Sequence, residues 1–253
     1  MRLKQLLESR GTVVDEITAL KDIEKHYGNA LRFAEKNKFV FRGVGEESSG
    51  DFVLIKPSQS VRVSKNTHNL YTLVIDGSSK WSKYPNRSKS IICTTDRHNT
   101  WAYGKSYIVL PKDGYKFGVC PKEDMWVSFE NTLGSTMGYG VNLSDFNDEV
   151  AELLDDMGMD YDIHSQLKTP SDLKALVKEM DKAFDESGIS ENRFDWLKGY
   201  QGSFLKLFEW ILDPNHNGFM LSNDIGKISA LTEREVWTDS DSYLVSWDWW
   251  KEQ

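Results

Sequence analysis

Arg42 is a charged side chain inside an otherwise apolar stretch, FVFRGV, at residues 39–44. Such a stretch is typical of a β-strand, where an arginine is costly unless it meets an anion or a carboxylate. The fork of N–H donors on a guanidinium matches the oxygens of a phosphate group, so a phosphate site is one interpretation. Taken alone, the residue is better explained as an arginine that faces water on an edge strand.

Hydroxyl side chains accompany a second apolar stretch, RSKSIICTTD, at residues 87–96. Ser88, Ser90, Thr94 and Thr95 can orient a carboxylate or a sugar from such a strand. A Ser/Thr-rich strand with one solvated face explains the same pattern, and by itself that is the simpler interpretation.

Glu233 and Glu235 are separated by one residue in LTEREVW, residues 231–237. Side chains two apart in a strand share a face, so both carboxylates are expected to project into the same space. Paired carboxylates can divide catalytic work, one stabilising a cationic centre and the other guiding a nucleophile. A loop-to-strand junction with two exposed acids would have the same spacing.

The order of these features, arginine strand, hydroxyl strand and ExE, is more specific than any one of them. It resembles the R-S-E class of mono-ADP-ribosyltransferases, which includes clostridial exoenzymes and phage-encoded transferases. Arg42 of FRG matches the arginine of the family's first strand, and Glu233 and Glu235 match its ExE motif. Residues 91–111, IICTTDRHNTWAYGKSYIVLP, resemble the family's Ser-Thr-Ser strand with its following helix and strand. The likeness covers roughly residues 15–130 and 220–247.

The Ser-Thr-Ser motif can be placed in two registers. Residues 93–95 (CTT) are preferred, because their distance to residues 102–104 (AYG) fits the family better. Residues 88–90 (SKS) are the alternative. The family also implies an aromatic side chain over nicotinamide, for which the candidates are Tyr103, Trp101 and Tyr107.

The resemblance implies that NAD+ is the substrate and that nicotinamide is released. Glu235 would hold the 2′-hydroxyl of the nicotinamide ribose and stabilise its oxocarbenium-like transition state. Glu233 would orient the incoming nucleophile, and Arg42 would bind the pyrophosphate or the ribose next to it. The implied NAD+-binding residues are Arg42, Gly43, Ser90, Thr94, Thr95 and Tyr103.

The leading hypothesis is therefore an NAD+-dependent mono-ADP-ribosyltransferase, a phage or toxin effector that modifies a macromolecule. The ExE motif, rather than QxE, suggests protein arginine as the acceptor. The basic stretch from Lys80 to Lys116 keeps nucleic acid as the alternative acceptor. Two other classes remain open: an NAD+ glycohydrolase, in which water is the acceptor, and a non-catalytic binding protein with a degenerate transferase fold. The presence of both Arg42 and Glu235 argues against degeneration.

The composition is that of a globular protein: of 253 residues, 39% are hydrophobic and 28% are charged. This mixture excludes wholesale disorder, and no run approaches the ~18 apolar residues of a membrane span. The first ten residues lack the apolar core of a secretory signal. Two cysteines, Cys93 and Cys120, exclude a disulfide scaffold and indicate a reducing compartment. The expected location is the cytoplasm, that of the host if the protein is phage-encoded, with no membrane partner.

No metal is expected, because the five histidines are dispersed without ligand spacing. Residues 213–224, which begin DPNHNG, resemble the start of a calcium loop. A turn that leads into the last strands is the preferred interpretation of this segment.

The charge changes sign along the chain. Residues 1–141 hold 21 lysines and arginines against 15 acids, whereas residues 142–253 hold 10 against 24. The pattern of apolar residues changes at the same place, from short β-rich runs to the spacing of helices. The sequence therefore predicts an α+β fold in a single catalytic domain, residues 1–253. It would be an ADP-ribosyltransferase-like twisted β-sheet with flanking helices and a helical insertion at about 142–212.

The expected elements follow from apolar spacing and turn residues. Strands are expected at residues 39–44, 52–55, 61–63, 71–75, 90–95, 107–110, 117–120, 126–129, 235–238 and 243–247. Helices are expected at residues 15–37, 97–103, 143–159, 169–188 and 190–212. Asp15 is expected to cap the first of these helices, Ser144 or Asp145 the third, and Thr169 the fourth.

Overall fold

A computed structural model describes residues 11–45, 50–57, 69–160, 167–190 and 192–253, and the chain divides into two compact units. The sheet unit comprises Met1–Arg62, Tyr84–Glu123 and Met220–Gln253. The helical unit comprises Val63–Lys83 and Asp124–Phe219. The segment expected as an insertion, 142–212, lies within the helical unit, which also includes the flanking residues 124–141 and 213–219 and the separate earlier stretch Val63–Lys83. In the described part of the chain, no helix is both long enough and apolar enough to cross a membrane.

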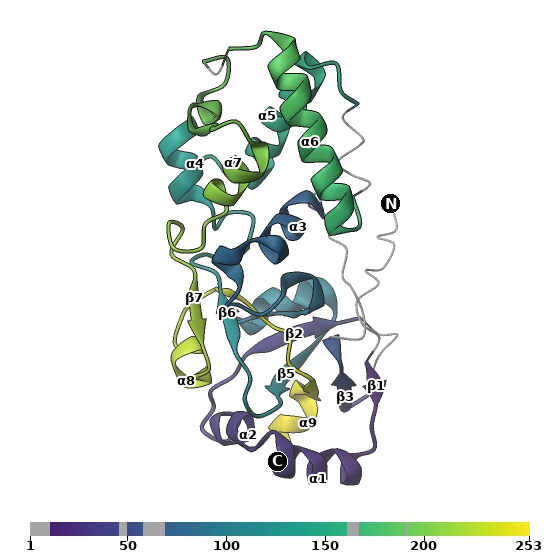
Figure 1. Ribbon diagram of the computed structural model, residues 1–253. Coiled ribbons are helices and arrows are strands. Elements are labelled where there is room, and N and C mark those ends of the chain that lie inside the picture. Colours follow the sequence, from purple (N-terminus) through teal and green to yellow (C-terminus); the bar gives the residue numbers. More distant parts are fainter. Residues whose placement is uncertain (1–10, 46–49, 58–68, 161–166, 191) are drawn as a thin grey trace. The chain divides into compact units, whose positions relative to one another are not determined.

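The sheet unit contains every strand of the described residues, joined in one nine-stranded sheet (Figure 1). All pairings are antiparallel, and the strand order is β1-β3-β9-β5-β2-β4-β8-β6-β7. The predicted α+β class is therefore confirmed. The strands are β1 (Thr12–Val13), β2 (Phe41–Val44), β3 (Phe52–Ile55), β4 (Ile91–Thr94), β5 (Lys105–Pro111), β6 (Phe117–Val119), β7 (Met220–Ser222), β8 (Glu235–Thr238) and β9 (Ser242–Ser246).

The first helix of the sheet unit begins at a side chain that accepts a backbone N–H bond. Asp15 caps α1, as expected, by accepting a 3.0 Å hydrogen bond from the Thr18 amide. The helix expected over 15–37 is split at Tyr27, whose φ of −128° is not helical. The α-helices are α1 (Glu16–His26), α2 (Gly28–Ala34), α8 (Ile225–Ile228) and α9 (Trp247–Lys251), and the 3₁₀ turns are η4 (Arg87–Lys89) and η5 (Arg97–Tyr103).

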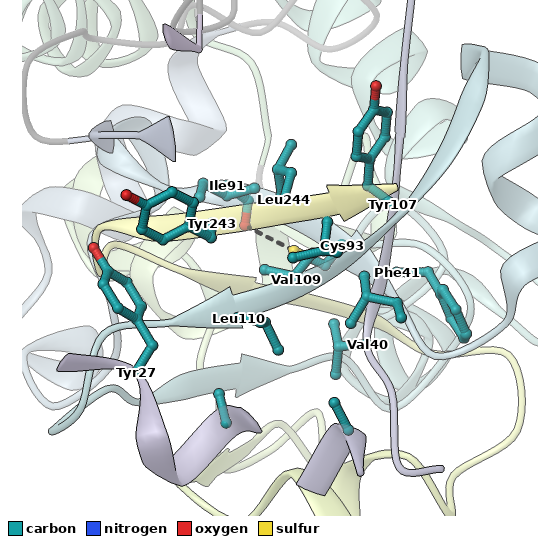
Figure 2. Packing of buried hydrophobic residues seen from close by; sticks show 14 of the residues in the cluster. Tyr27, Val40, Phe41, Ile91, Cys93, Tyr107, Val109, Leu110, Tyr243 and Leu244 are labelled. Carbon is teal, nitrogen blue, oxygen red and sulfur yellow. Dashed lines mark hydrogen bonds between the residues drawn. The ribbon is translucent and has the colours of Figure 1, made fainter. Parts of the chain in front are cut away.

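One apolar cluster packs between the sheet and the helices α1, α2 and α8. Figure 2 shows part of it, with the rings of Tyr27 and Tyr243 near one another and a dashed line for the hydrogen bond between Cys93 and Ile91. The two tyrosine rings meet edge to face at 5.0 Å between centroids. The Cys93 thiol donates to the Ile91 carbonyl at 3.7 Å, so the cysteine acts as a core residue.

The two longest helices of the helical unit are amphipathic and begin with capping boxes. Thr169 and Asp172 form a capping box at the start of α6, with Pro170 in the first turn, as the sequence predicts. For α5 the predicted cap, Ser144 or Asp145, was wrong by two or three residues. Asn142 caps the helix, and Asp145 closes its capping box. The helical elements of this unit are α3 (Asn69–Gly77), η3 (Ser79–Trp81), α4 (Glu130–Met137), α5 (Leu143–Asp156), α6 (Pro170–Ser187), η7 (Asp195–Gly199) and α7 (Phe204–Ile211).

Three predicted strands differ from the structure. Residues 71–75 belong to the helix α3, whose apolar side chains are buried all round and so lack a diagnostic period. Residues 126–129 form turns, because the Asp124 side chain accepts the Trp126 amide at 2.7 Å. The last strand ends at Ser246, which caps α9, and residues 61–63 lie outside the described residues.

The helix predicted over 190–212 is also interrupted. Among the described residues of this segment, only η7 and α7 are helical. Gly202 between them has a φ of +72°, a conformation that glycine adopts readily. The Phe204 amide at the start of α7 donates to the Asp181 carboxylate at 2.7 Å.

Candidate active site

Three adjacent strands carry the residues that the sequence singled out. In the sheet order, β4 lies between β2 and β8, and β2 lies between β5 and β4. The register pairs Phe41 with Thr94, and Thr94 with Glu235. The arginine strand, the hydroxyl strand and the strand of Glu235 are therefore neighbours, and one row of side chains runs across all three.

Arg42 lies on an interior strand, so the edge-strand interpretation is wrong. Its side chain is buried, with 8% of the residue exposed, and Nη1 donates to the Ile92 carbonyl. Burial lowers the pKa of the guanidinium, while the charges of Cys93 and Tyr103 act in the opposite sense. Neighbouring positions in a strand face opposite sides, so Arg42 projects from the face opposite to Phe41, Thr94 and Glu235.

Gly43 lets the backbone of η5 approach β2. A Cβ at this position would lie 2.4 Å from the Thr100 carbonyl oxygen and 2.7 Å from Tyr103 Cβ. Gly104, which ends η5, has a φ of +119° and packs equally tightly on the Val44 carbonyl. Gly43 therefore has a packing role, which allows residues 97–103 to lie against β2.

The predicted hydroxyl side chains hold the local backbone. Ser90 Oγ donates to the Asn86 carbonyl at 2.6 Å. Thr94 Oγ1 accepts the Asp96 amide at 3.1 Å, and Thr95 Oγ1 accepts the Arg234 amide at 2.9 Å. The bond from Arg234 to Thr95 joins the end of the hydroxyl strand to the middle residue of the ExE motif.

The sequence predicted that Glu233 and Glu235 share a strand face, and this prediction is wrong. The strand β8 begins at Glu235, and Glu233 precedes it with a φ of +50°, which breaks the alternation of an extended chain. Glu233 is exposed, whereas Glu235 is half-buried. The two carboxylates therefore stand in different surroundings, one at the surface and one in the sheet.

Glu235 forms an ion pair that the sequence did not reveal. Arg87 Nη2 lies 2.7 Å from Glu235 Oε1, and the two side chains are 9% and 13% exposed. The thiol of Cys120 lies 3.7 Å from the same oxygen. Arg87 opens the 87–96 segment, and in the sequence its only signal was membership of a basic stretch.

Cys93 lies near three charged side chains of these strands and of the turn before them. Burial raises the pKa of its thiol to about 12, and the charges of Arg42, Glu235 and Arg87 all act on it. This thiol is neutral at ordinary pH and is not a nucleophile.

The aromatic candidates separate into buried and exposed residues. Tyr107 is 0% exposed and its hydroxyl donates to the Gly50 carbonyl, so it cannot cover a ligand. Trp101 and Tyr103 on η5 are 60% and 62% exposed. The Arg97 guanidinium lies 5.7 Å from the Trp101 ring and 5.2 Å from the Trp247 ring, which fixes this turn by cation–π contacts.

Among the described residues, no group of three or more histidine, cysteine or acidic side chains could hold a metal ion. The carboxylates that resembled calcium ligands have protein partners. Asp213 pairs with Lys80 at 2.8 Å, and Asp224 caps α8 by accepting the Lys227 amide at 3.1 Å. Residues 213–218 form a turn, as the preferred interpretation expected.

No protein-family model, no curated protein and no solved structure matches this chain. The assignment of a function therefore depends on the residues themselves and on their arrangement in the sheet.

Proposed function

We propose that this protein is a mono-ADP-ribosyltransferase that cleaves NAD+ and transfers ADP-ribose to a macromolecule, with protein arginine as the acceptor. The observation that carries the proposal is the adjacency of β2, β4 and β8, which holds Arg42, Thr94 and Glu235 on neighbouring strands. These positions match the family's arginine, hydroxyl and glutamate motifs in the same chain order. The ADP-ribosyltransferase-like fold is part of the same proposal.

In this reaction the bond between C1′ of the ribose and the nicotinamide nitrogen breaks, and nicotinamide leaves with the bonding electrons. The ribose acquires positive charge, which a fixed carboxylate stabilises most effectively in a site shielded from water. Glu235 is suited to this task, because its carboxylate is half-buried and held in place. The acceptor nitrogen then bonds to C1′ and loses a proton, which exposed Glu233 is placed to accept and pass to solvent.

Binding of NAD+ is assigned to side chains around η5 and β2. Trp101 and Tyr103 offer exposed rings for nicotinamide, and Gly43 allows η5 to lie close to the strand. Arg42 is the expected partner of the pyrophosphate or of the adjacent ribose.

A second candidate is a binding protein without catalysis. Two observations favour it: Arg42 and Glu235 lie on opposite faces by register, and Glu235 is already paired with Arg87. An NAD+ glycohydrolase, in which water is the acceptor, is the third candidate that an experiment must distinguish.

One experiment distinguishes the three. The protein is incubated with NAD+ labelled on its adenylate phosphate, with and without a cell lysate, and nicotinamide release is followed in parallel. Label on protein supports transfer to protein, label on RNA or DNA redirects the acceptor, and free ADP-ribose without labelled macromolecule supports hydrolysis. Intact NAD+ in both reactions contradicts the enzymatic proposal and leaves the binding protein.

A further inference from the structure

The carboxylate of Glu235 is held by one of its two oxygens. Oε1 receives both the Arg87 guanidinium at 2.7 Å and the Cys120 thiol at 3.7 Å. These two contacts fix the orientation of the carboxylate.

Arg87 is itself held rigidly on β8. Its guanidinium lies 5.3 Å from the centre of the Trp237 ring. Trp237 follows Glu235 by two residues in β8, so the two side chains share a face of the strand. The Trp237 indole N–H donates to the Pro85 carbonyl at 3.0 Å, and Tyr84 stacks on the same indole at 6.2 Å with 16° between the planes. The segment that carries Arg87 is thus docked on Trp237 by three contacts.

Space for that indole is provided by Gly118 on β6. Gly118 pairs with Trp237, and a Cβ at Gly118 would lie 2.2 Å from Trp237 Cζ2. A side chain at residue 118 would displace the ring on which Arg87 rests. The sequence thus builds a series of supports, from Gly118 to Trp237, from Trp237 to Arg87, and from Arg87 to Glu235.

We infer that Arg87 is the positioning residue of Glu235. This inference rests on the proposed function. By fixing Oε1, Arg87 keeps Oε2 aimed at the ribose hydroxyl without any rotamer entropy being lost when the transition state forms. Arg42, on the opposite face of the sheet, cannot supply this contact.

The test compares NAD+ cleavage by the wild type, Arg87→Met, Arg87→Ala and Arg87→Lys. Lys89→Met is the matched control, since Lys89 is an exposed cation of the same short turn η4. Arg87→Met is expected to lower kcat by on the order of 10–100-fold, as the loss of supporting contacts around a catalytic group typically does, and to leave KM for NAD+ unchanged. Arg87→Lys keeps the charge but loses the fork of donors, so its kcat is expected to lie between those of the wild type and Arg87→Met.

Chemical rescue separates positioning from a purely structural role. Arg87→Ala leaves a cavity of guanidinium size, and guanidinium chloride at non-denaturing concentration is expected to restore part of kcat in this variant alone. A structural role would instead lower thermal stability without a kcat that responds to guanidinium.

Equal kcat values for Lys89→Met and a folded Arg87→Met overturn the inference and leave the proposed function intact. The same holds if KM rises while kcat is constant, or if Arg87→Ala does not respond to guanidinium. If Arg87→Met fails to fold, Arg87→Lys and the guanidinium titration of Arg87→Ala decide. A wild type that does not cleave NAD+ overturns both proposals together.

Discussion

Thr94 on β4 and Glu235 on β8 are direct partners in the sheet, and the row they form continues to Phe41 on β2. Segments far apart in the sequence are thereby brought within two strands of one another. Thr95, the next residue, closes the same junction by exchanging two hydrogen bonds with Arg234. The hydroxyl strand therefore positions the ExE segment through its backbone as well as through the register.

Arg42→Ala is expected to weaken NAD+ binding. Each charge-assisted contact that is lost costs roughly 1.5–3 kcal/mol of binding free energy. Calorimetric titration with NAD+ measures the difference, with Arg32→Ala, an exposed arginine on α2, as the control. Equal affinities for the two variants would remove Arg42 from the NAD+ site.

Gly118→Ala is expected to destabilise the sheet unit, because the new methyl group would overlap the Trp237 ring. Overpacking of this kind costs about 1–3 kcal/mol of the free energy of unfolding. Urea denaturation followed by tryptophan fluorescence provides the measurement. Gly45→Ala is the control, since a Cβ at Gly45 meets no atom of the described residues within 4 Å. Equal stabilities of the two variants would show that the ring does not occupy this position.

Asp213 is expected to make the helical unit sensitive to acid. Burial acts to raise the pKa of this carboxyl, but the bond from Lys80 and the amide of Asn215 outweigh it, so the pKa lies below the usual value. A lowered folded-state pKa contributes stability above the unfolded value, which is lost as the pH falls through the folded value.

Asp213→Asn should therefore lower the free energy of unfolding at neutral pH by about 1–3 kcal/mol. It should also reduce the further loss of stability down to about pH 3. Denaturant unfolding across this range tests both effects, with Asp195→Asn as the control because the Asp195–Lys198 pair is exposed. An unchanged pH dependence in Asp213→Asn would contradict the assignment.

The Cys93 thiol is expected to resist alkylation in the folded protein. Burial raises its pKa to about 12, so the reactive thiolate is scarce at roughly pH 8. Peptide mass spectrometry after treatment with iodoacetamide should find Cys93 unmodified in buffer and modified in urea. Rapid modification of the native protein would show that the β4 strand opens to solvent.

Local signals in the sequence predicted much of the fold. The caps at Asp15 and Thr169 and the strand at 52–55 are confirmed, because each depends on neighbouring residues alone. The strand predicted at 71–75 is wrong, because a short apolar run has no period that separates a buried helix from a buried strand. The pairing of the hydroxyl strand with β8 depends on contacts distant in sequence, which spacing does not encode.

The site was predicted less completely than the fold. The strands that carry Arg42, Thr94 and Glu235 are neighbours, but the alternation of side chains separates Arg42 from Glu235. The shared face expected for Glu233 was wrong, because a positive φ at a loop residue is not visible in a period of two. Arg87 was overlooked since only the fold buries it against Trp237.

The central claim is that Glu235 stabilises the cationic transition state of NAD+ cleavage, and nicotinamide release by Glu235→Gln tests it most directly. The substitution keeps the size of the side chain and removes its charge, so the rate should fall by on the order of 10²-fold or more, for hydrolysis and transfer alike. Glu233→Gln is the matched control, which should lose transfer to the acceptor while slow hydrolysis continues. Wild-type rates of nicotinamide release from a folded Glu235→Gln protein would contradict the transferase assignment itself.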